Sequence, residues 1–266
     1  MKIRCLLPVG LIALVTLASA AWAEDYQALV QRSEKRVYRD AAGAALPYRL
    51  FRPAKYDRQQ KYPLIIFLHG AGERGDDNTR QLVHAQVLRF VSDEAQAKHP
   101  CFLIAPQCPA GHRWMEVDWG KTPAPPLPEQ PSVPMRLTMG LLDSLQKEFR
   151  IDADRIYVTG LSMGGFGTYD LTMRRPDQIA AAIPVCGGVD VSRAKQVAHI
   201  PFWIFHGGAD SVVNVALSRS MVETLKGAGA SPHYTEFPGV GHNCWSKAYL
   251  EPDLVEWLFS QTRRSK

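Results

Sequence analysis

The sequence lacks the spacings that usually mark a metal ion, and it lacks the glycine motif at the start of a predicted helix that a nucleotide cofactor would need. Its eight histidines and five cysteines form no H-E-x-x-H or C-x-x-C spacing, so we expect no metal site. The G-x-G-x-x-G spacing of Gly70 to Gly75 lies in a predicted loop and does not open a predicted helix, so we expect neither a dinucleotide nor any other cofactor. Any chemistry would therefore rest on amino-acid side chains.

Long apolar runs are also scarce, apart from the N-terminus. The residues Met1-Lys2-Ile3-Arg4 precede an apolar run from Cys5 to about Leu17, and small residues then lead to Ala23. This order is typical of a secretory signal peptide, and the run is shorter than the roughly 20 residues that a transmembrane helix needs. We expect cleavage after Ala23, with Ala20 as the other candidate. The product would be exported, periplasmic or secreted, without a membrane span.

Charge of one sign is not concentrated anywhere except at the C-terminus. The 31 basic residues lose Lys2 and Arg4 with the signal peptide, and the remaining 29 face 26 acidic residues. Apart from the tail Arg263-Arg264-Ser265-Lys266 the basic residues are scattered, so we expect no nucleic-acid partner. Internal repeats and linker-like stretches are missing as well, which predicts a single domain over residues 24–266. The sequence leaves the oligomeric state open.

The remaining sequence alternates between strand-like and helix-like segments. The apolar run 63–68 predicts a strand that is buried on both faces, as in a parallel sheet. A hairpin at the sheet edge is predicted over 36–39 and 48–51, further strands over 102–105, 156–159, 179–186, 201–205 and 233–237, and helices over 79–97, 134–149, 165–174, 213–227 and 252–259. This alternation predicts an α/β fold with a mostly parallel central sheet and helices on both faces.

One long segment does not fit this alternation. Residues 106–134 are too rich in proline for a helix or a central strand. They leave the carboxyl end of a predicted strand, which is the edge of an open α/β sheet where ligands bind. Two interpretations are open: a flap that carries Trp114 and Trp119 to a substrate, or a loop that packs these aromatic side chains onto the body.

The sequence Gly160-Leu161-Ser162-Met163-Gly164 joins a predicted strand to a predicted helix. This arrangement is typical of a nucleophile elbow, a sharp turn that exposes a strained serine. The flanking glycines are needed where a Cβ atom would collide with neighbouring backbone. Ser162 is therefore the candidate nucleophile.

A serine hydroxyl needs a base that is itself oriented by an acid. Asp210 follows the predicted strand 201–205, and His242 follows the predicted strand 233–237. The order serine, acid, histidine, with the last two on loops after late strands, is that of enzymes with this elbow. We therefore predict the triad Ser162, Asp210 and His242, with Asp190 as a rival acid.

The same chemistry requires two amide donors for an oxyanion. One would come from Met163, directly after the serine, and the other from the glycine-rich loop 69–75. Small residues in this loop favour Ala71, with Gly72 as the alternative. We interpret His69 in the same loop as structural.

Two further groups of residues lie near this predicted site. Trp114, Trp119 and Trp245 are candidate substrate contacts, although packing alone would also explain them. Four cysteines follow the signal peptide. Cys101 and Cys108 flank an extended run and are too far apart to pair. Cys186 and Cys244 are either a disulfide near the site or buried free thiols.

The motifs Leu68-His69-Gly70-Ala71-Gly72-Glu73-Arg74-Gly75, Ala105-Pro106-Gln107-Cys108-Pro109, Gly160-Leu161-Ser162-Met163-Gly164-Gly165 and Pro238-Gly239-Val240-Gly241-His242 together carry a resemblance. The chain resembles secreted α/β-hydrolase esterases of the predicted-peptidase or phospholipase/carboxylesterase group, similar to polyhydroxybutyrate-depolymerase-like and feruloyl-type esterases. The resemblance implies a serine carboxylesterase that hydrolyses small-molecule or polymer-linked esters through an acyl-enzyme, without a cofactor. The alternatives are a serine peptidase of the same fold and a non-catalytic binding protein. The acyl and alcohol groups of the substrate stay open.

Overall fold

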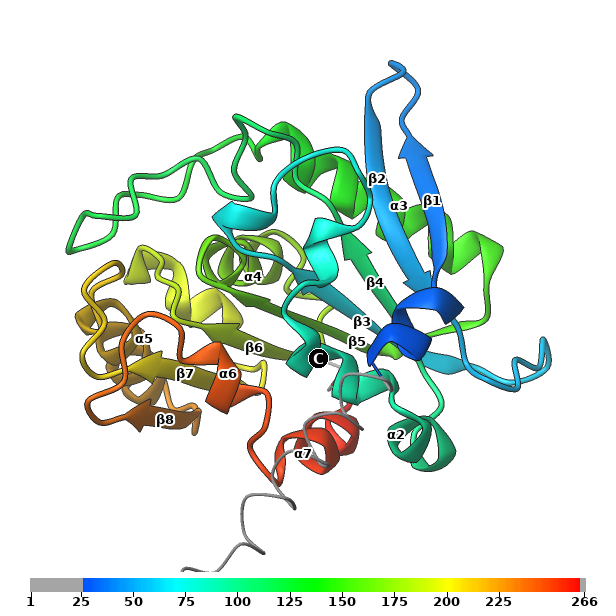
Figure 1. Cartoon of the computed structure of the whole chain (residues 1–266). Helices are drawn as coiled ribbons and strands as arrows, with labels where there is room; N and C mark the ends of the chain where they lie inside the picture. Colours follow the sequence, from blue (N-terminus) through cyan, green and yellow to red (C-terminus); the bar gives the residue numbers. More distant parts are fainter. Residues whose placement is uncertain (1–25, 264–266) are drawn as a thin grey trace, which may run out of the picture.

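An eight-stranded sheet forms the centre of the computed structural model, which describes residues 26–263 (Figure 1). The predicted signal peptide and its cleavage site lie outside the described residues. The strands are β1 (Glu34–Arg39), β2 (Ala45–Phe51), β3 (Tyr62–Leu68), β4 (Phe102–Pro106), β5 (Ile151–Leu161), β6 (Ala181–Val185), β7 (Trp203–Gly207) and β8 (His233–Phe237). Their order across the sheet is β1-β2-β4-β3-β5-β6-β7-β8.

The antiparallel pairs gather at one edge of this sheet. β1 pairs with β2 as the predicted edge hairpin, and β2 continues antiparallel to β4. From β4 through β3, β5, β6 and β7 to β8 all neighbouring strands are parallel. Because parallel strands end at a common edge, the segments that follow β5, β7 and β8 meet there, which is what the predicted site requires.

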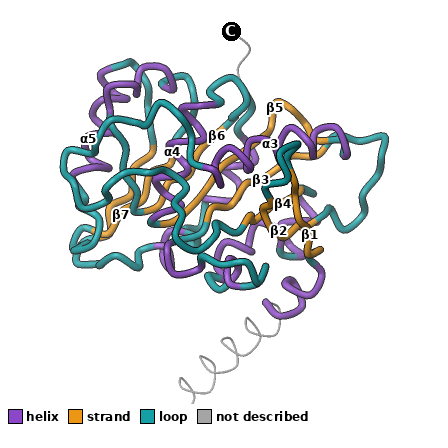
Figure 2. Tube along the Cα trace, turned by 90° about the horizontal axis from the view of Figure 1, so that it is seen from above, coloured by secondary structure: helices purple, strands orange, loops and turns teal. Residues whose placement is uncertain are grey.

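The helices cover both faces of the sheet, as Figures 1 and 2 show. They are the 3₁₀ segments η1 (Ala71–Glu73), η2 (Arg80–Leu82), η3 (Ala85–Val91) and η4 (Val191–Val197), and the α-helices α2 (Asp93–Lys98), α3 (Val133–Glu148), α4 (Met163–Arg174), α5 (Ala216–Gly227), α6 (Trp245–Ala248) and α7 (Leu254–Ser260), preceded by a helical turn at 26–32. Among the described residues, none of these helices is long and apolar enough to cross a bilayer.

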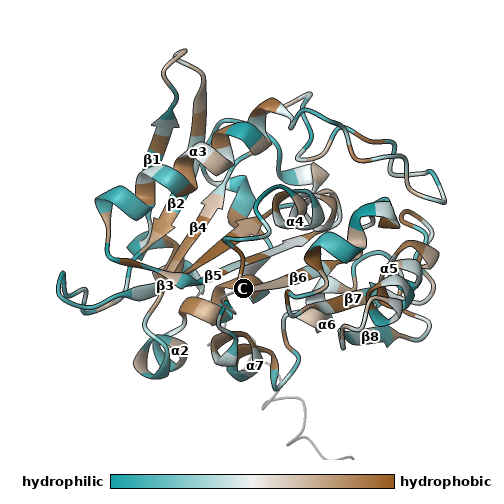
Figure 3. Cartoon of the chain, turned by 180° about the vertical axis from the view of Figure 1, so that it is seen from behind, coloured by the Kyte–Doolittle hydropathy of each residue, from teal (hydrophilic) through white to brown (hydrophobic). Residues whose placement is uncertain are grey.

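β3 explains why the sheet needs a helical layer on each side. All seven of its residues are buried, and successive side chains of a strand point to opposite faces. Ile66 belongs to the core shared with α3 and α4, whereas Phe67 belongs to the core shared with η3 and α7. The hydropathy colours of Figure 3 show the same apolar central strands. The α/β fold that the alternation predicts is confirmed.

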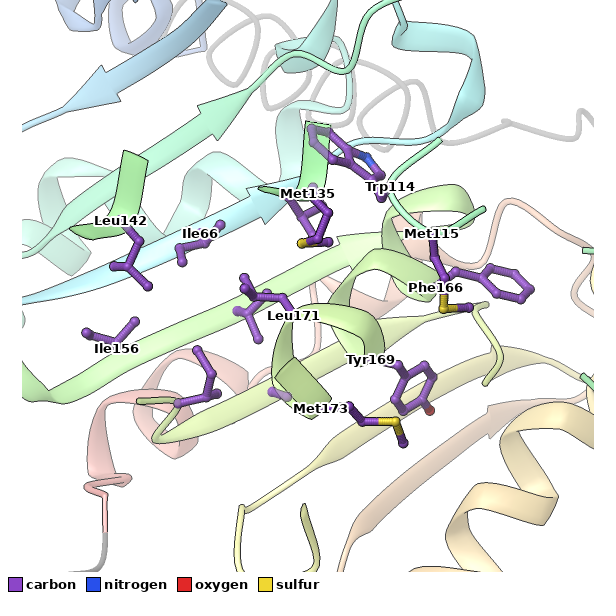
Figure 4. Close-up of a cluster of buried hydrophobic side chains, with 14 of the residues drawn as sticks. Ile66, Trp114, Met115, Met135, Leu142, Ile156, Phe166, Tyr169, Leu171 and Met173 are labelled. Carbon is purple, nitrogen blue, oxygen red and sulfur yellow. The ribbon is translucent and has the colours of Figure 1, made fainter. Parts of the chain in front are cut away.

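α4 lies against the centre of the first face. Figure 4 shows Phe166, Tyr169 and Leu171 of this helix in one cluster with Ile66 of β3 and Met135 of α3. The helix at 134–149 is confirmed as α3, whose N-terminus is capped by the Ser132 side chain accepting a hydrogen bond from the Met135 amide at 3.1 Å. This packing fixes the position of α4 and hence of the residue that precedes it.

The prediction of one helix over 79–97 is wrong. Short 3₁₀ segments occupy most of this range, and only Asp93–Lys98 forms an α-helix. The backbone leaves helical geometry at His84 (ψ 78°) and again at Ser92 (ψ 160°). The Ser92 hydroxyl accepts a hydrogen bond from the Ala95 amide and so starts a new helix. Apolar periodicity alone does not reveal this local competition for backbone donors.

Candidate active site

Ser162 lies at the junction between β5 and α4, where the chain reverses direction sharply. Its backbone angles are φ 53° and ψ −118°, which a residue with a side chain rarely adopts. The Ser162 amide donates to the carbonyl of Val185 on β6 at 2.9 Å, and this bond helps to hold the turn. The hydroxyl does not cap α4, so it is available to other partners.

Two glycines make this turn possible. A Cβ atom at Gly164 would collide with the carbonyl group of Leu68, and a Cβ atom at Gly160 would collide with the carbonyl groups of Gly164 and Leu68. Backbone carbonyl groups in a packed sheet cannot move aside, so both positions exclude larger residues. The strained serine is therefore fixed by close contact between β5, α4 and the end of β3.

The structure brings Ser162, His242 and Asp210 together. The Nε2 atom of His242 lies 2.8 Å from the Ser162 Oγ atom, and its Nδ1 atom lies 2.7 Å from the Oδ2 atom of Asp210. A carboxylate only accepts, so Nδ1 carries the proton and Nε2 accepts the hydrogen bond of the serine hydroxyl. This tautomer is the one that can take a proton from Ser162.

The side chain of Asp210 is inaccessible to solvent, and its carboxylate accepts several hydrogen bonds. Its Oδ1 atom accepts from the amides of Val212 and Val213 at 2.8 and 2.9 Å. Burial by itself would raise the pKa of Asp210, but the hydrogen bonds from His206, His242 and these amides outweigh it and hold the pKa well below 3.8. Asp210 is therefore a fixed carboxylate next to His242.

His206 is a neighbour of this site that the sequence patterns did not single out. It ends β7 and is fully buried, with Nδ1 2.7 Å from the Ser218 hydroxyl and Nε2 3.0 Å from the Val213 carbonyl. The Nε2 atom also lies 3.3 Å from the Oδ2 atom of Asp210. Both neighbours of Nε2 are acceptors, so the proton sits there and the Ser218 hydroxyl donates to Nδ1. The only sequence signal was a histidine four residues before the candidate acid.

The rival acid Asp190 is placed elsewhere. Its carboxylate accepts from the Ser192 amide at 3.1 Å and from the Ser192 hydroxyl at 2.6 Å, so it caps η4. Of the two candidate acids, the structure therefore brings only Asp210 against His242 among the described contacts.

The glycine-rich loop after β3 approaches the same edge of the sheet. η1 begins at Ala71, and no side chain caps its start or the start of α4 at Met163. His69 is buried, and its ring lies 2.6 Å from the Gly70 carbonyl and 2.9 Å from the Cys108 amide. Burial lowers the pKa of His69 to about 4, so its ring is neutral and ties the loop to the segment after β4. Both predicted amide donors thus begin helical turns whose N–H groups are uncapped.

The Trp245 side chain packs against the His242 ring. Its ring stands edge-on to the His242 ring with centroids 5.4 Å apart, and it meets the His84 ring at 5.2 Å. His84 in turn lies 3.2 Å from the carboxylate of Glu73 in the glycine-rich loop 69–75. The half-buried Trp245 side chain therefore limits how far the His242 ring can move away from Ser162.

The other two tryptophans differ sharply in their exposure. Trp114 is fully buried, donates to the His69 carbonyl at 3.0 Å and packs against Gly167 of α4. Of the two interpretations of Trp114, the structure has the side chain packed onto the body, where packing takes its whole surface. Trp119 is only half-buried; Arg113 lies over its ring at 4.4 Å, and Phe166 of α4 is a neighbour.

The four cysteines that the structure describes are all buried free thiols. Cys186 lies at the carboxyl end of β6 with φ 40°, and its thiol is within hydrogen-bonding reach of the Cys244 thiol. The sequence left open whether Cys186 and Cys244 form a disulfide or are buried free thiols, and in the structure they are free thiols. Burial raises the pKa of Cys186 well above its ordinary value.

The fold and the contacts around Ser162 define an α/β-hydrolase, and comparison with known proteins identifies the family. The profile of the phospholipase/carboxylesterase family matches residues 55–250. Because the match covers well over half of the chain, this chain belongs to the phospholipase/carboxylesterase family, whose members are hydrolases of the esterase type.

Individual relatives agree with this assignment. The crystal structure of a thermostable esterase superposes with a TM-score of 0.83 at 38% identity, over 89% of this chain and 64% of that one. A bifunctional acetylxylan esterase/xylanase of Neocallimastix patriciarum is 37% identical over 75 residues, 28% of this chain and 11% of the relative. An uncharacterized secreted protein of Arthroderma benhamiae is 26% identical over 80% of this chain and 25% of its own length. The chain thus spans a quarter or less of these two curated relatives.

Proposed function

We propose that this protein is an exported serine carboxylesterase. The observation that carries the proposal is the continuous chain of contacts from the Ser162 hydroxyl to His242 at 2.8 Å and on to Asp210 at 2.7 Å. Export rests on the pattern of residues 1–23 and is supported by the similarity to a secreted fungal protein.

The proposed reaction has two halves. The Ser162 oxygen attacks the ester carbonyl carbon while His242 Nε2 takes the hydroxyl proton, and the carbonyl becomes an oxyanion. The imidazolium then gives this proton to the departing alcohol, which leaves an acyl group on Ser162. In the second half, water loses a proton to His242 and attacks the acyl carbon; the acid leaves, and the proton returns to Ser162.

The remaining residues stabilise charge in this scheme. Asp210 holds the His242 ring in the required tautomer and offsets the positive charge that forms on it. The amides of Met163 and Ala71 are the proposed oxyanion donors, aided by the positive end of the α4 dipole. Trp119 and Trp245 are the proposed aromatic contacts for the substrate.

The direct test is hydrolysis of p-nitrophenyl butyrate by residues 24–266, with Ser162→Ala as the inactive variant. The proposal predicts turnover in the first protein and only the background rate in the second. Equal rates would refute it. A panel of acetyl, feruloyl and polyester substrates, together with a peptide anilide, then separates ester from peptide hydrolysis.

A further inference from the structure

A thiol, a carboxylate and an imidazole lie close together next to the candidate nucleophile. A single ligand atom from each of Cys186, Asp210 and His242 lies within 4.8 Å of the other two. These residues follow β6, β7 and β8, so the parallel sheet itself brings them to one place. The reaction proposed above uses Asp210 and His242 but gives the thiol no part.

These three groups are a suitable donor set for zinc. Zn²⁺ binds thiolate sulfur, imidazole nitrogen and carboxylate oxygen, and its tetrahedral bond lengths place neighbouring donors about 3.5 Å apart. The Oδ2 atom of Asp210 and the Nδ1 atom of His242, which lie 2.7 Å apart, would have to separate slightly. The pairs that include the Cys186 sulfur lie within 4.8 Å and would have to approach by at most about 1.3 Å. The Cys244 thiol is a neighbour of the Cys186 thiol but lies outside this group of three donors, so the fourth position is left to water. The partly exposed ring of His242, with 19% of its side chain accessible, gives the site contact with solvent.

We infer that Cys186, Asp210 and His242 bind a thiophilic divalent cation such as Zn²⁺, and that the bound ion inhibits the enzyme. The binding stands on the geometry alone; the inhibition rests on the proposed function. No short sequence motif marks this site, because its donors come from three separate loops.

The inhibition follows from the two nitrogens of one ring. Metal at the Nδ1 atom of His242 displaces the proton through which the ring donates a hydrogen bond to Asp210, and a neutral imidazole must then carry its proton on Nε2. Such a ring donates to Ser162 instead of accepting from it, so it cannot take the serine proton. The Cys186 thiol releases its proton to solvent as the Zn–S bond forms, so charge and protons balance.

The first experiment measures p-nitrophenyl butyrate hydrolysis against increasing Zn²⁺ for three proteins. The unmodified chain should be inhibited, and Cys186→Ser should require at least about tenfold more Zn²⁺. Cys101→Ser is the matched control, because Cys101 is a buried thiol that directly precedes β4 and lies outside this cluster. This variant should keep the original inhibition. Equal inhibition of all three proteins would overturn the inference.

The second experiment does not depend on esterase activity. Co²⁺ is added to the Ser162→Ala protein, and the thiolate-to-cobalt absorption band is recorded. We expect one equivalent to bind, with the band lost in Ser162→Ala/Cys186→Ser and weakened in Ser162→Ala/His242→Ala. Two different variants are used so that the test still stands if one of them fails to fold. Circular dichroism shows whether each variant is folded. Absence of the band, or recovery of Cys186 and Cys244 as a disulfide, would overturn the site. A band in the Ser162→Ala protein, together with no ester turnover by the unmodified chain, would leave the site standing and refute the proposed function.

Discussion

Replacing Asp210 with asparagine should reverse the hydrogen bonding of His242. The Oδ1 atom of Asp210 accepts from the amides of Val212 and Val213, so the single oxygen of an asparagine must stay on that side. Its NH₂ group then faces the Nδ1 atom of His242, where the Oδ2 atom of the carboxylate lay at 2.7 Å. An amide nitrogen can only donate, so Nδ1 must become the acceptor and the ring proton moves to Nε2.

The expected loss in kcat is roughly 10⁴-fold, because the wrong tautomer cannot take the serine proton. This factor corresponds to about 5.4 kcal/mol of activation free energy. Measurement of kcat for p-nitrophenyl butyrate checks it, with Asp190→Asn as the matched control. Asp190 caps η4 and does not touch His242, so the control should keep kcat within about twofold. An Asp210→Asn enzyme within tenfold of the original would refute the role given to Asp210.

The same variant should also change how stability depends on acid. The pKa of Asp210 is held below 3.8 in the folded protein, so its carboxylate stabilises the fold fully above that value. This contribution is lost as the pH falls through the lower folded-state pKa. Between about pH 4 and pH 2 the free energy of unfolding should therefore fall more steeply for the original protein than for Asp210→Asn. Urea unfolding at several pH values measures both slopes; parallel slopes would contradict the assignment.

Three further variants test the surroundings of the site. Gly164→Ala should cost at least about 3 kcal/mol in thermal unfolding, because its Cβ meets the Leu68 carbonyl, whereas Gly72→Ala has open space and should be nearly neutral. His206→Gln should lower kcat roughly tenfold through the loss of a donor to Asp210, with the exposed His199→Gln as control; an unchanged kcat would show that His206 is only structural. Trp114→Ala should destabilise the fold by about 3–5 kcal/mol, while Trp119→Ala should mainly raise KM, and the opposite pattern would reverse their roles.

Patterns that depend on local geometry were predictable from the sequence. The apolar run of β3 indicated a strand that is buried on both faces, and the glycines around Ser162 indicated the sharp turn into α4. The placement of Asp210 and His242 after β7 and β8 followed from the rule that parallel strands end at one edge.

Features that depend on contacts between distant segments were not predictable. The sequence favoured Asp210 but could not exclude Asp190, because both residues follow predicted strands and the exclusion depends on which loop faces His242. The role of Trp114 depends on its packing against α4, and that of His206 on its contacts with Ser218 and Val213. In each case the role of the residue depends on a partner that lies elsewhere in the sequence. Hydrophobic periodicity does not describe such side-chain contacts.

The measurement that tests the central claim most directly is labelling with a fluorophosphonate probe, followed by peptide mass analysis. Such a probe modifies a serine oxygen only when a neighbouring base activates it. We predict a single label on Ser162, no label in Ser162→Ala and much slower labelling in His242→Ala. No label on Ser162, or labelling that is unaffected by the loss of His242, would contradict the account.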